Sequence, residues 1–405
     1  MGRIVHFGLG NFARAHLLDY TSDAGGWDVI GVSLRSTSAR DGLAPQHFNY
    51  TLNVQGKGLK SIQVLVDILV ASEGPEAILG AMHCADIISA TVTEKGYHLG
   101  ADNKLDLRDP AIISDLNGNP LQTLIGFIAH HLAARCSPVT ILSCDNRVEN
   151  GTRLQQAVAS FAQAAGLKIN WDNVRFPNAM VDRITPATTD AIRVSSADPM
   201  AVPTEAFREW VLEDNFAAPR PNWPDVQFVQ DVRPHELRKL RILNGAHSFL
   251  AYAGLAQGYS YVHEAIADPY LRRRTKQLMM EAGATLPSDM RDQVPDYANA
   301  LLARFGNVEL AHRLDQIAMD GSQKLPYRFL ETLRAGRGPI VAEAVRSWME
   351  FCRVQTDQGR ALNDPKALDI ARAVRSKNPK IALLEIIGGA DYAHPYEQSG
   401  ELCLL

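Results

Sequence analysis

Near its N-terminus the chain reads Gly8-Leu9-Gly10-Asn11-Phe12-Ala13, directly after the apolar run Ile4–Phe7. This spacing matches G-x-G-x-x-G/A, the turn between the first strand of a nucleotide-binding sheet and the following helix. Gly8 permits a tight turn, and Gly10 lets the backbone approach a pyrophosphate that the helix N-terminus attracts. The segment therefore predicts a cofactor-binding turn with Gly8, Gly10, Asn11 and Phe12 at the cofactor. A purely structural turn is the less favoured alternative.

The predicted second strand, Trp27–Leu34, ends without the acidic residue that usually binds the ribose of NAD. Arg35 follows instead, a cation suited to stacking on adenine or to meeting a 2′-phosphate. A solvated turn is an equally good interpretation of this segment. We expect NAD as the cofactor, with Arg35 as a contact and NADP not excluded.

Strand-like and helix-like segments alternate through the first half of the chain. Val/Ile-rich runs separated by helix-length segments predict βαβ units around a parallel sheet. The predicted strands after Ile4–Phe7 are Trp27–Leu34, Ile62–Val70, Ala85–Val92 and Pro138–Cys144. The predicted helices are residues 11–23, Thr123–Ala134 and Thr152–Ala165.

Long patterns with a 3.6-residue period dominate from about Arg233 onward. A proline-rich connector, Ala217–Pro224, precedes them. The predicted helices are Leu237–Ala256, Pro269–Gly283, Asp296–Phe305, Val308–Met319, Pro339–Thr356 and Pro365–Ser376. We therefore predict an α/β Rossmann-type N-terminal domain over residues 1–230 and a mostly α-helical C-terminal domain over residues 231–405.

The overall composition excludes several classes of protein. The 405 residues carry 41 Lys plus Arg against 45 Asp plus Glu, a formal net charge of −4, which offers nucleic acid no broad basic face. The first residues are strand-like, so we expect no secretory leader, and no apolar stretch approaches the ~20 residues that cross a bilayer. The five cysteines form no C-x-x-C pair and no H-E-x-x-H occurs. We expect a cytoplasmic protein without a metal site.

The segment Glu236–His247 places several polar residues on one apolar face. On an α-helix Glu236, Lys239, Asn244 and His247 fall within about 140°, together with three leucines. A buried ammonium loses affinity for its proton, so Lys239 is a candidate general base. Arg238 and Arg241 fall outside this sector and are expected to be solvated. An ordinary amphipathic helix, with its lysine reaching solvent, explains the spacing equally well.

The same segment resembles the K-x4-N-x2-H active-site helix of the polyol-specific long-chain dehydrogenases, the mannitol dehydrogenase family. Residues 8–16 are similar to that family's G-x-G-N-F-x-R-A-H opening. Residues 143–146, with Asn150-Gly151, resemble its S-C-D-N and N-G segments, and residues 176–186 resemble the signature around V-D-R-I-T-P. Smaller similarities lie at residues 93–97 and 320–324.

The resemblance implies a zinc-independent NAD(P) enzyme that interconverts a sugar alcohol or aldonate with its ketose. By matching position, it makes Lys239 the general base and places Asn244 and His247 at the reacting oxygen. It places Glu236 on the proton path, and Asn178 and Lys324 at the substrate. Asn146 is a further cofactor-binding candidate. The chain departs from the family in its short length between the signature and Lys239.

Three hypotheses follow for the activity. The leading one is a mannitol 2-dehydrogenase-type oxidation of mannitol to fructose. The alternative within the same chemistry is reduction of fructuronate to mannonate, a fructuronate reductase activity. From another class comes a non-catalytic NAD(H)-binding module. In each case we expect a small-molecule partner, neither nucleic acid nor membrane, and a monomer or small homo-oligomer.

Overall fold

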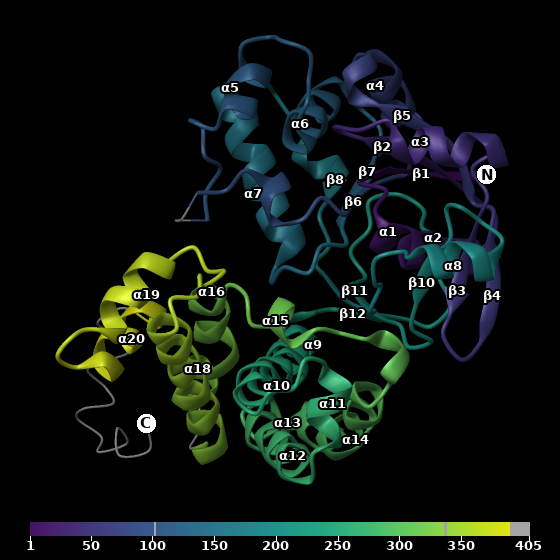
Figure 1. Ribbon diagram of the computed structural model, residues 1–405. Coiled ribbons are helices and arrows are strands. Elements are labelled where there is room, and N and C mark those ends of the chain that lie inside the picture. The colour runs from purple at the N-terminus through teal and green to yellow at the C-terminus, as the bar shows by residue number, and fades with distance from the viewer. Residues whose placement is uncertain (101–102, 336–337, 389–405) are drawn as a thin grey trace. The chain divides into compact units, whose positions relative to one another are not determined.

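The computed structural model describes residues 1–100, 103–335 and 338–388 (Figure 1). The chain divides into two compact units, residues 1–233 and a unit that begins at Pro234. Each unit has its own hydrophobic core. The first unit is α/β and the second is helical, the fold class that the sequence predicts.

A six-stranded parallel sheet forms the centre of the first unit. Its strand order is β5-β2-β1-β6-β7-β8, so the chain reverses direction across the sheet between β1 and β6. Open α/β sheets bind ligands at this reversal, outside the carboxyl ends of the strands. The strands are β1 (Gly2–Phe7), β2 (Trp27–Ser33), β5 (Leu65–Val70), β6 (Ile87–Ala90), β7 (Val139–Ser143) and β8 (Val174–Arg175).

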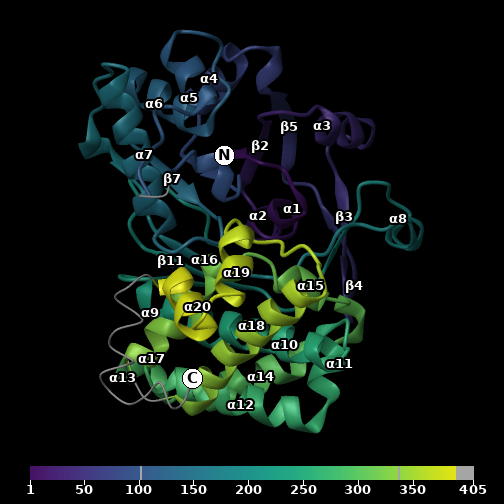
Figure 2. The ribbon, with the colours of Figure 1, turned by 60° about the vertical axis from the view of Figure 1, so that its left-hand side comes forward.

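Both faces of this sheet are buried. Because successive strand residues point to opposite faces, Val5 and Phe7 join one core cluster while Ile4 joins another. The first cluster includes residues of α4 (Glu76–His83), α6 (Leu124–Ala134) and α7 (Asn150–Ala164). The second includes residues of α2 (Leu17–Ala24). This layering is visible in Figures 1 and 2 and accounts for the near-continuous apolar strands.

Two three-stranded sheets complete the first unit, and neither was predicted from the sequence. One has the order β10-β3-β4 and the other β12-β11-β9. The single strand predicted over Ile62–Val70 is wrong, because its start belongs to β4 and its remainder to β5. The added strands are β3 (Tyr50–Val54), β4 (Gly58–Ile62), β9 (Ala179–Asp182), β10 (Val202–Thr204), β11 (Glu209–Glu213) and β12 (Val226–Val229).

A buried ionic network connects these sheets to α2. Asp19 Oδ2 lies 2.5 Å from Arg183 Nη1 and 2.9 Å from Arg208 Nη1, and Asp19 Oδ1 lies 2.5 Å from Lys60 Nζ. Burial alone would raise the pKa of Asp19, but the hydrogen bonds and charges of Lys60 and Arg183 lower it. A buried carboxylate is tolerated only with such partners. Arg183 of the V-D-R-I-T-P segment is therefore bound within the fold.

The second unit is built from helices and short helical turns. Its first long helix runs through α9 (Arg233–Arg238), a π-helical turn at Lys239–Asn244 (η5) and α10 (Gly245–Ala256). The others are α11 (Val262–Ala267), α12 (Pro269–Gly283), α13 (Ser288–Arg291), α14 (Val294–Phe305), α15 (Leu314–Ile317), α16 (Gly321–Leu325), a second π-helical turn at Pro326–Leu330 (η7), α17 (Glu331–Ala335), α18 (Pro339–Asp357), α19 (Ala367–Val374) and α20 (Pro379–Gly388).

The helix predicted over Val308–Met319 is wrong. A short 3-10 turn at Val308–Leu310 ends at Ala311, whose φ of +42° is left-handed and incompatible with a continuing helix. The chain resumes only the short helix α15. The hydrophobic periodicity of this segment reflects the burial of Leu310, Leu314 and Ile317. It does not correspond to a continuous helix.

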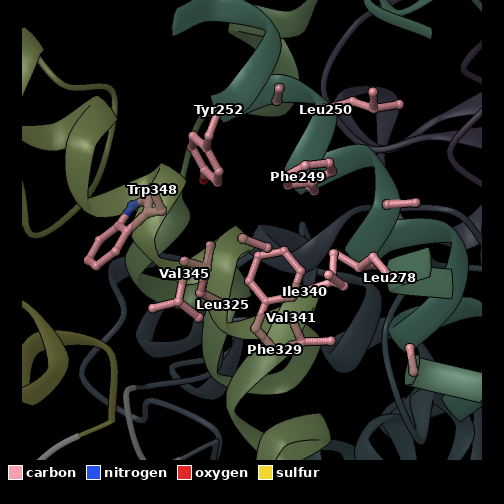
Figure 3. Packing of buried hydrophobic residues seen from close by; sticks show 14 of the residues in the cluster. Phe249, Leu250, Tyr252, Leu278, Leu325, Phe329, Ile340, Val341, Val345 and Trp348 are labelled. Carbon is pink, nitrogen blue, oxygen red and sulfur yellow. The ribbon is translucent and has the colours of Figure 1, made fainter. Parts of the chain in front are cut away.

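The core of the second unit lies between α10, η7 and α18 (Figure 3). Phe249 and Tyr252 of α10 lie beside Phe329 of η7 and Trp348 of α18, all of them buried. A Cβ at Gly321 would lie 2.5 Å from the Trp348 indole nitrogen, so the glycine of the D-G-S-Q-K segment is required by packing. Across the described ranges, no helix combines the length and apolar character needed to span a membrane.

Candidate active site

The glycine turn lies between β1 and α1 (Asn11–Ala15), at the reversal point of the parallel sheet. Gly8 has a φ of +94°, and a Cβ there would lie 2.1 Å from the carbonyl oxygen of Thr91 after β6. Only glycine fits such a position. A Cβ at Gly10 would meet nothing within 4 Å, so the backbone is open on that side. This arrangement suits close approach of a phosphate group.

The side chains of Asn11 and Phe12 are engaged within the first unit. Asn11 Nδ2 donates to the Pro186 carbonyl at 3.1 Å and to Thr188 Oγ1 at 3.2 Å, and its oxygen accepts from Arg14. Phe12 stacks on His16 with ring centroids 4.9 Å apart. Asn11 therefore attaches the turn to the end of the V-D-R-I-T-P segment and to Thr188 beyond it. The cofactor contacts of Asn11 and Phe12 stay predictions.

Asp145 of the S-C-D-N segment holds the loop that follows β6. Its carboxylate accepts the backbone N–H groups of Val92 at 3.2 Å and Thr93 at 2.8 Å, and the Tyr97 hydroxyl at 3.1 Å. Burial raises the pKa of Asp145. Thr93 has a φ of +64°, a strained conformation for a β-branched residue. Two sequence motifs thus combine to fix one loop beside the glycine turn.

Asn178 is nearly buried and its amide is occupied by neighbours in the first unit. Its oxygen accepts from the Thr152 backbone at 2.9 Å, and its nitrogen donates to Thr152 Oγ1 at 3.1 Å and to Glu213 at 3.2 Å. At Gly151, a Cβ would lie 2.3 Å from the Pro177 carbonyl oxygen, which explains the N-G pair. The predicted substrate contact of Asn178 is not tested by this geometry.

Two other cofactor-binding candidates are exposed. Arg35 follows β2 and Asn146 follows β7, both at carboxyl ends of strands in the parallel sheet. Their positions are compatible with ligand contact, because this is the edge where such sheets bind ligands. Their roles stay predictions.

Lys239 opens the π-helical turn of the second unit and is 8% exposed. Glu236, one turn earlier, is also buried. Turns of the π type often lie at functional sites because they widen the helix locally. The burial expected for Lys239 is therefore found, while its role as a base stays a prediction.

The expectation that Arg238 and Arg241 are solvated is wrong. Both are buried: Arg238 lies over the Tyr297 ring at 4.5 Å, and Arg241 Nη1 donates to the Thr285 carbonyl and hydroxyl at 3.0 Å each. Burial lowers the pKa of Arg241. The prediction placed the side chains as on a regular α-helix, but the π turn changes the directions in which they point. Neighbouring helices also cover more than one face of this helix.

His247 is buried between aromatic rings one turn beyond Asn244. Its ring stacks on Phe305 with centroids 4.3 Å apart and meets the edge of His312 at 5.3 Å. Burial first, and then the charges of His312, Arg304, Arg328 and Lys239, lower the pKa of His247 well below its ordinary value. The imidazole is therefore neutral, with one nitrogen able to donate and the other able to accept.

Asn244 is half-buried at the end of the π turn. Its backbone carbonyl accepts from Arg328 Nη1 at 3.3 Å, and the same nitrogen donates to Ser248 Oγ at 2.8 Å. Within the part of the chain that the structure describes, neither the Asn244 carboxamide nor the His247 ring nitrogens make a hydrogen bond. These are the groups that a substrate oxygen can engage.

Lys324 lies on α16, where its Nζ donates to the Met319 carbonyl at 2.7 Å and lies 3.9 Å from Asp320. Its side chain is 28% exposed, and its substrate contact stays a prediction. Among residues 1–100, 103–335 and 338–388, no group of three His, Cys, Asp or Glu side chains could hold a metal ion.

Sequence reasoning missed the neighbours of His247. His312 is far from His247 in the sequence, and its closeness to that ring arises from the fold. Arg304 and Arg328 lie on separate helices and carry no spacing relation to His247.

Comparison with known proteins agrees with the sequence motifs. Residues 2–225 match the family model described as the mannitol dehydrogenase Rossmann domain, and residues 231–388 match the mannitol dehydrogenase C-terminal domain. D-mannonate oxidoreductase of Escherichia coli (strain K12) is 39% identical, covering 89% of this chain and 82% of that protein. Mannitol 2-dehydrogenase of Phaeosphaeria nodorum is 35% identical, covering 95% of this chain and 75% of that protein.

Solved structures give the same result. The mannitol 2-dehydrogenase of Pseudomonas fluorescens, in a ternary complex with NAD and D-mannitol, is 31% identical with a TM-score of 0.81. The match covers 99% of this chain and 92% of that one. A substrate-free D-sorbitol dehydrogenase is 29% identical with a TM-score of 0.82, covering 96% and 90%. The chain therefore belongs to the mannitol dehydrogenase family of oxidoreductases.

Proposed function

We propose that the protein is an NAD-dependent dehydrogenase that interconverts a secondary alcohol of a sugar alcohol with the ketone of its ketose. The observation that carries this proposal is the helix of residues 233–256. It presents a buried Lys239, an Asn244 carboxamide without a hydrogen bond in the described chain, and a neutral His247. An amine, an amide donor and an imidazole are the groups needed to move a proton and to stabilise a developing alkoxide.

The glycine turn fits a dinucleotide. Gly8 forms the tight turn and Gly10 leaves the backbone open at the sheet reversal, and Arg35 and Asn146 are exposed at the same strand ends. The Pseudomonas fluorescens relative, 31% identical over nearly the whole chain, was solved with NAD. When bound, the nicotinamide supplies hydride transfer to or from the substrate carbon. We propose NAD as the cofactor, with these four residues holding it.

Each residue of the helix has a proposed role. Lys239 takes the proton of the hydroxyl during oxidation and returns it during reduction. Asn244 donates an amide hydrogen to the reacting oxygen as negative charge develops on it, and His247 fixes that oxygen through its neutral ring. Glu236 passes the proton onward, and Asn178 and Lys324 are proposed substrate ligands by resemblance. Because an ammonium and amide donors polarise the oxygen, we propose that the reaction needs no metal.

A second candidate is the oxidation of a hexonate, or the reduction of its hexuronate ketose. The observation that favours it is the positive charge around His247, where Lys239, Arg304 and Arg328 all act on the ring. A substrate carboxylate would be attracted to three such cations. The relative named D-mannonate oxidoreductase is 39% identical to this chain, and the relative named mannitol 2-dehydrogenase is 35% identical. Relatives named for a sugar acid and for a sugar alcohol are therefore similarly close in sequence.

The proposal is tested by following nicotinamide absorbance with D-mannitol and D-mannonate in turn, each with NAD⁺ and with NADP⁺. Turnover of mannitol with NAD⁺ is the expected result. Turnover of mannonate alone, with a KM that rises with added salt, would select the second candidate because salt screens charge attraction. Binding of NAD⁺ without turnover of any polyol or hexonate would overturn both and leave a non-catalytic module.

Lys239→Ala sharpens this test. Loss of the base is expected to lower kcat by on the order of 10²–10⁴ with the Kd for NAD⁺ nearly unchanged. Lys276→Ala is the matched control, since Lys276 lies on α12 and its Nζ donates to the exposed Asn299 at 2.9 Å. Turnover of Lys239→Ala at the rate of this control would exclude Lys239 as the base.

A further inference from the structure

A buried histidine lies directly beneath the glycine turn. His6 occupies the apolar strand β1 and has no exposed surface. Its Nδ1 lies 2.8 Å from Ser89 Oγ, and its Nε2 lies 3.0 Å from Thr91 Oγ1 and 3.2 Å from the Gly8 carbonyl oxygen. An imidazole in a parallel-sheet core costs several kcal/mol unless it is hydrogen-bonded. These contacts meet that requirement, and the two made by Nε2 lie at the turn.

The direction of each hydrogen bond follows from the groups present. A carbonyl only accepts, so Thr91 Oγ1 donates its one proton to the Gly8 oxygen, 2.7 Å away. Thr91 must then accept from His6, which places the ring proton on Nε2. His6 Nδ1 consequently accepts from the Ser89 hydroxyl. Burial, which lowers the pKa of His6 to about 4, agrees with this neutral ring.

This chain of bonds fixes one peptide plane. Gly8 donates its own N–H to the Val32 carbonyl at 2.9 Å, while its carbonyl is held from the other side by Thr91 and His6. Because a trans peptide is planar, holding the Gly8 oxygen also fixes the opposite direction of the Leu9 N–H. Leu9 in turn packs against Gly31, where a Cβ would lie 2.1 Å from Leu9 Cδ1.

We propose that His6 and Thr91, termed the His6–Thr91 relay, are positioning residues that hold the Gly8 peptide in its cofactor-binding orientation. The relay touches the backbone of the turn and acts on NAD only through it. This inference rests on the proposed NAD dependence. Its consequence is that the relay controls cofactor affinity more than the rate of the chemical step.

Thr91→Val removes the hydroxyl and keeps the shape of the side chain. We expect the Kd for NAD⁺, measured by calorimetric titration, to rise on the order of tenfold, because the Gly8 carbonyl loses its hydrogen bond from Thr91. The kcat at saturating NAD⁺ should stay within about twofold of the wild type, and Thr91→Ser should restore binding because it keeps the bond. The matched control is Thr140→Val in β7, which removes a buried hydroxyl bonded to the Ala217 N–H at 3.0 Å.

Both valine variants are expected to lower the thermal midpoint, but only Thr91→Val should weaken NAD⁺. Equal Kd values for Thr91→Val and the wild type, or equal weakening by both variants, would overturn the relay. His6→Gln gives an independent route if Thr91→Val does not fold, and an unchanged Kd in His6→Gln would overturn it as well. A wild-type chain that does not bind NAD⁺ would instead overturn the proposed function, and this inference with it.

Discussion

The polar motif residues of the two units differ in what they bond to. In the first unit the side-chain amides of Asn11 and Asn178 form hydrogen bonds with neighbouring backbone and side-chain groups. In the second unit Asn244 and His247 present polar atoms that no described residue hydrogen-bonds. Four residues carried over from one family pattern thus fall into two physical groups. Membership in a motif identifies an important position, and the bonding around it distinguishes side chains already engaged within the fold from side chains with available polar atoms.

Replacing Asn244 and Asn178 by alanine, one at a time, tests this difference between the units most directly. Asn244→Ala should lower kcat/KM on the order of 10²–10³, because a donor to the developing oxyanion is lost. Its free energy of unfolding should change by no more than about 0.5 kcal/mol, since no internal hydrogen bond is broken. Urea unfolding beside steady-state kinetics measures both quantities.

Asn178→Ala is the counterpart in the first unit. Removing its amide leaves the Thr152 N–H without its partner and takes the side-chain hydrogen bond from the Glu213 carboxylate, which still accepts from the Asn178 backbone N–H. This should cost about 1–3 kcal/mol of stability. If Asn244→Ala destabilised the chain as much as Asn178→Ala does, the distinction between the two groups of residues would fail.

Acid should destabilise both units through a buried histidine in each. His6 in the first unit has its pKa lowered by burial to about 4, against 6.5 when unfolded. The unfolded chain therefore binds this proton first. Stability from this residue is complete above pH 6.5 and is lost as the pH falls toward 4, by about 3 kcal/mol in all. His247 in the second unit has the same direction of shift, so it adds a loss of the same sign.

Unfolding followed by circular dichroism between pH 7 and pH 4 checks this expectation. His6→Gln and His247→Gln should each flatten the dependence of stability on pH by about one proton. A wild-type slope retained in both variants would show that other groups govern acid unfolding.

The sequence could predict the glycine turn, the parallel sheet and most long helices, because each leaves a local signal of period or turn chemistry. It could not predict the break at His16, which divides the expected helix of residues 11–23 into α1 and α2. His16 lies among Phe12, Tyr20 and Trp210, and Trp210 comes from a distant strand. Non-local packing of this kind has no local pattern.

The candidate site shows the same limit. The spacing of Lys239, Asn244 and His247 could be found in the sequence, and the family resemblance assigned their roles. The predicted exposure of Arg238 and Arg241 was wrong, because apolar periodicity cannot distinguish a π-helical turn from an α-helical turn. Nor could spacing predict that Asn178 bonds Glu213 of another strand, or that His312 meets His247.

Arg35 gives the smallest expected effect and adds a third kind of motif position, neither buried nor internally bonded among the described residues. An exposed cation contributes at most about 1 kcal/mol, a fivefold change in Kd. Arg35→Ala should therefore raise the Kd for NADP⁺ by up to about fivefold, through the lost attraction to its 2′-phosphate, and the Kd for NAD⁺ by less. Arg40→Ala is the control, since Arg40 pairs with Glu73 at 2.5 Å. An equal response of both cofactors would place Arg35 at the adenine, where its stacking does not distinguish NAD from NADP, and would leave that discrimination to other residues after β2.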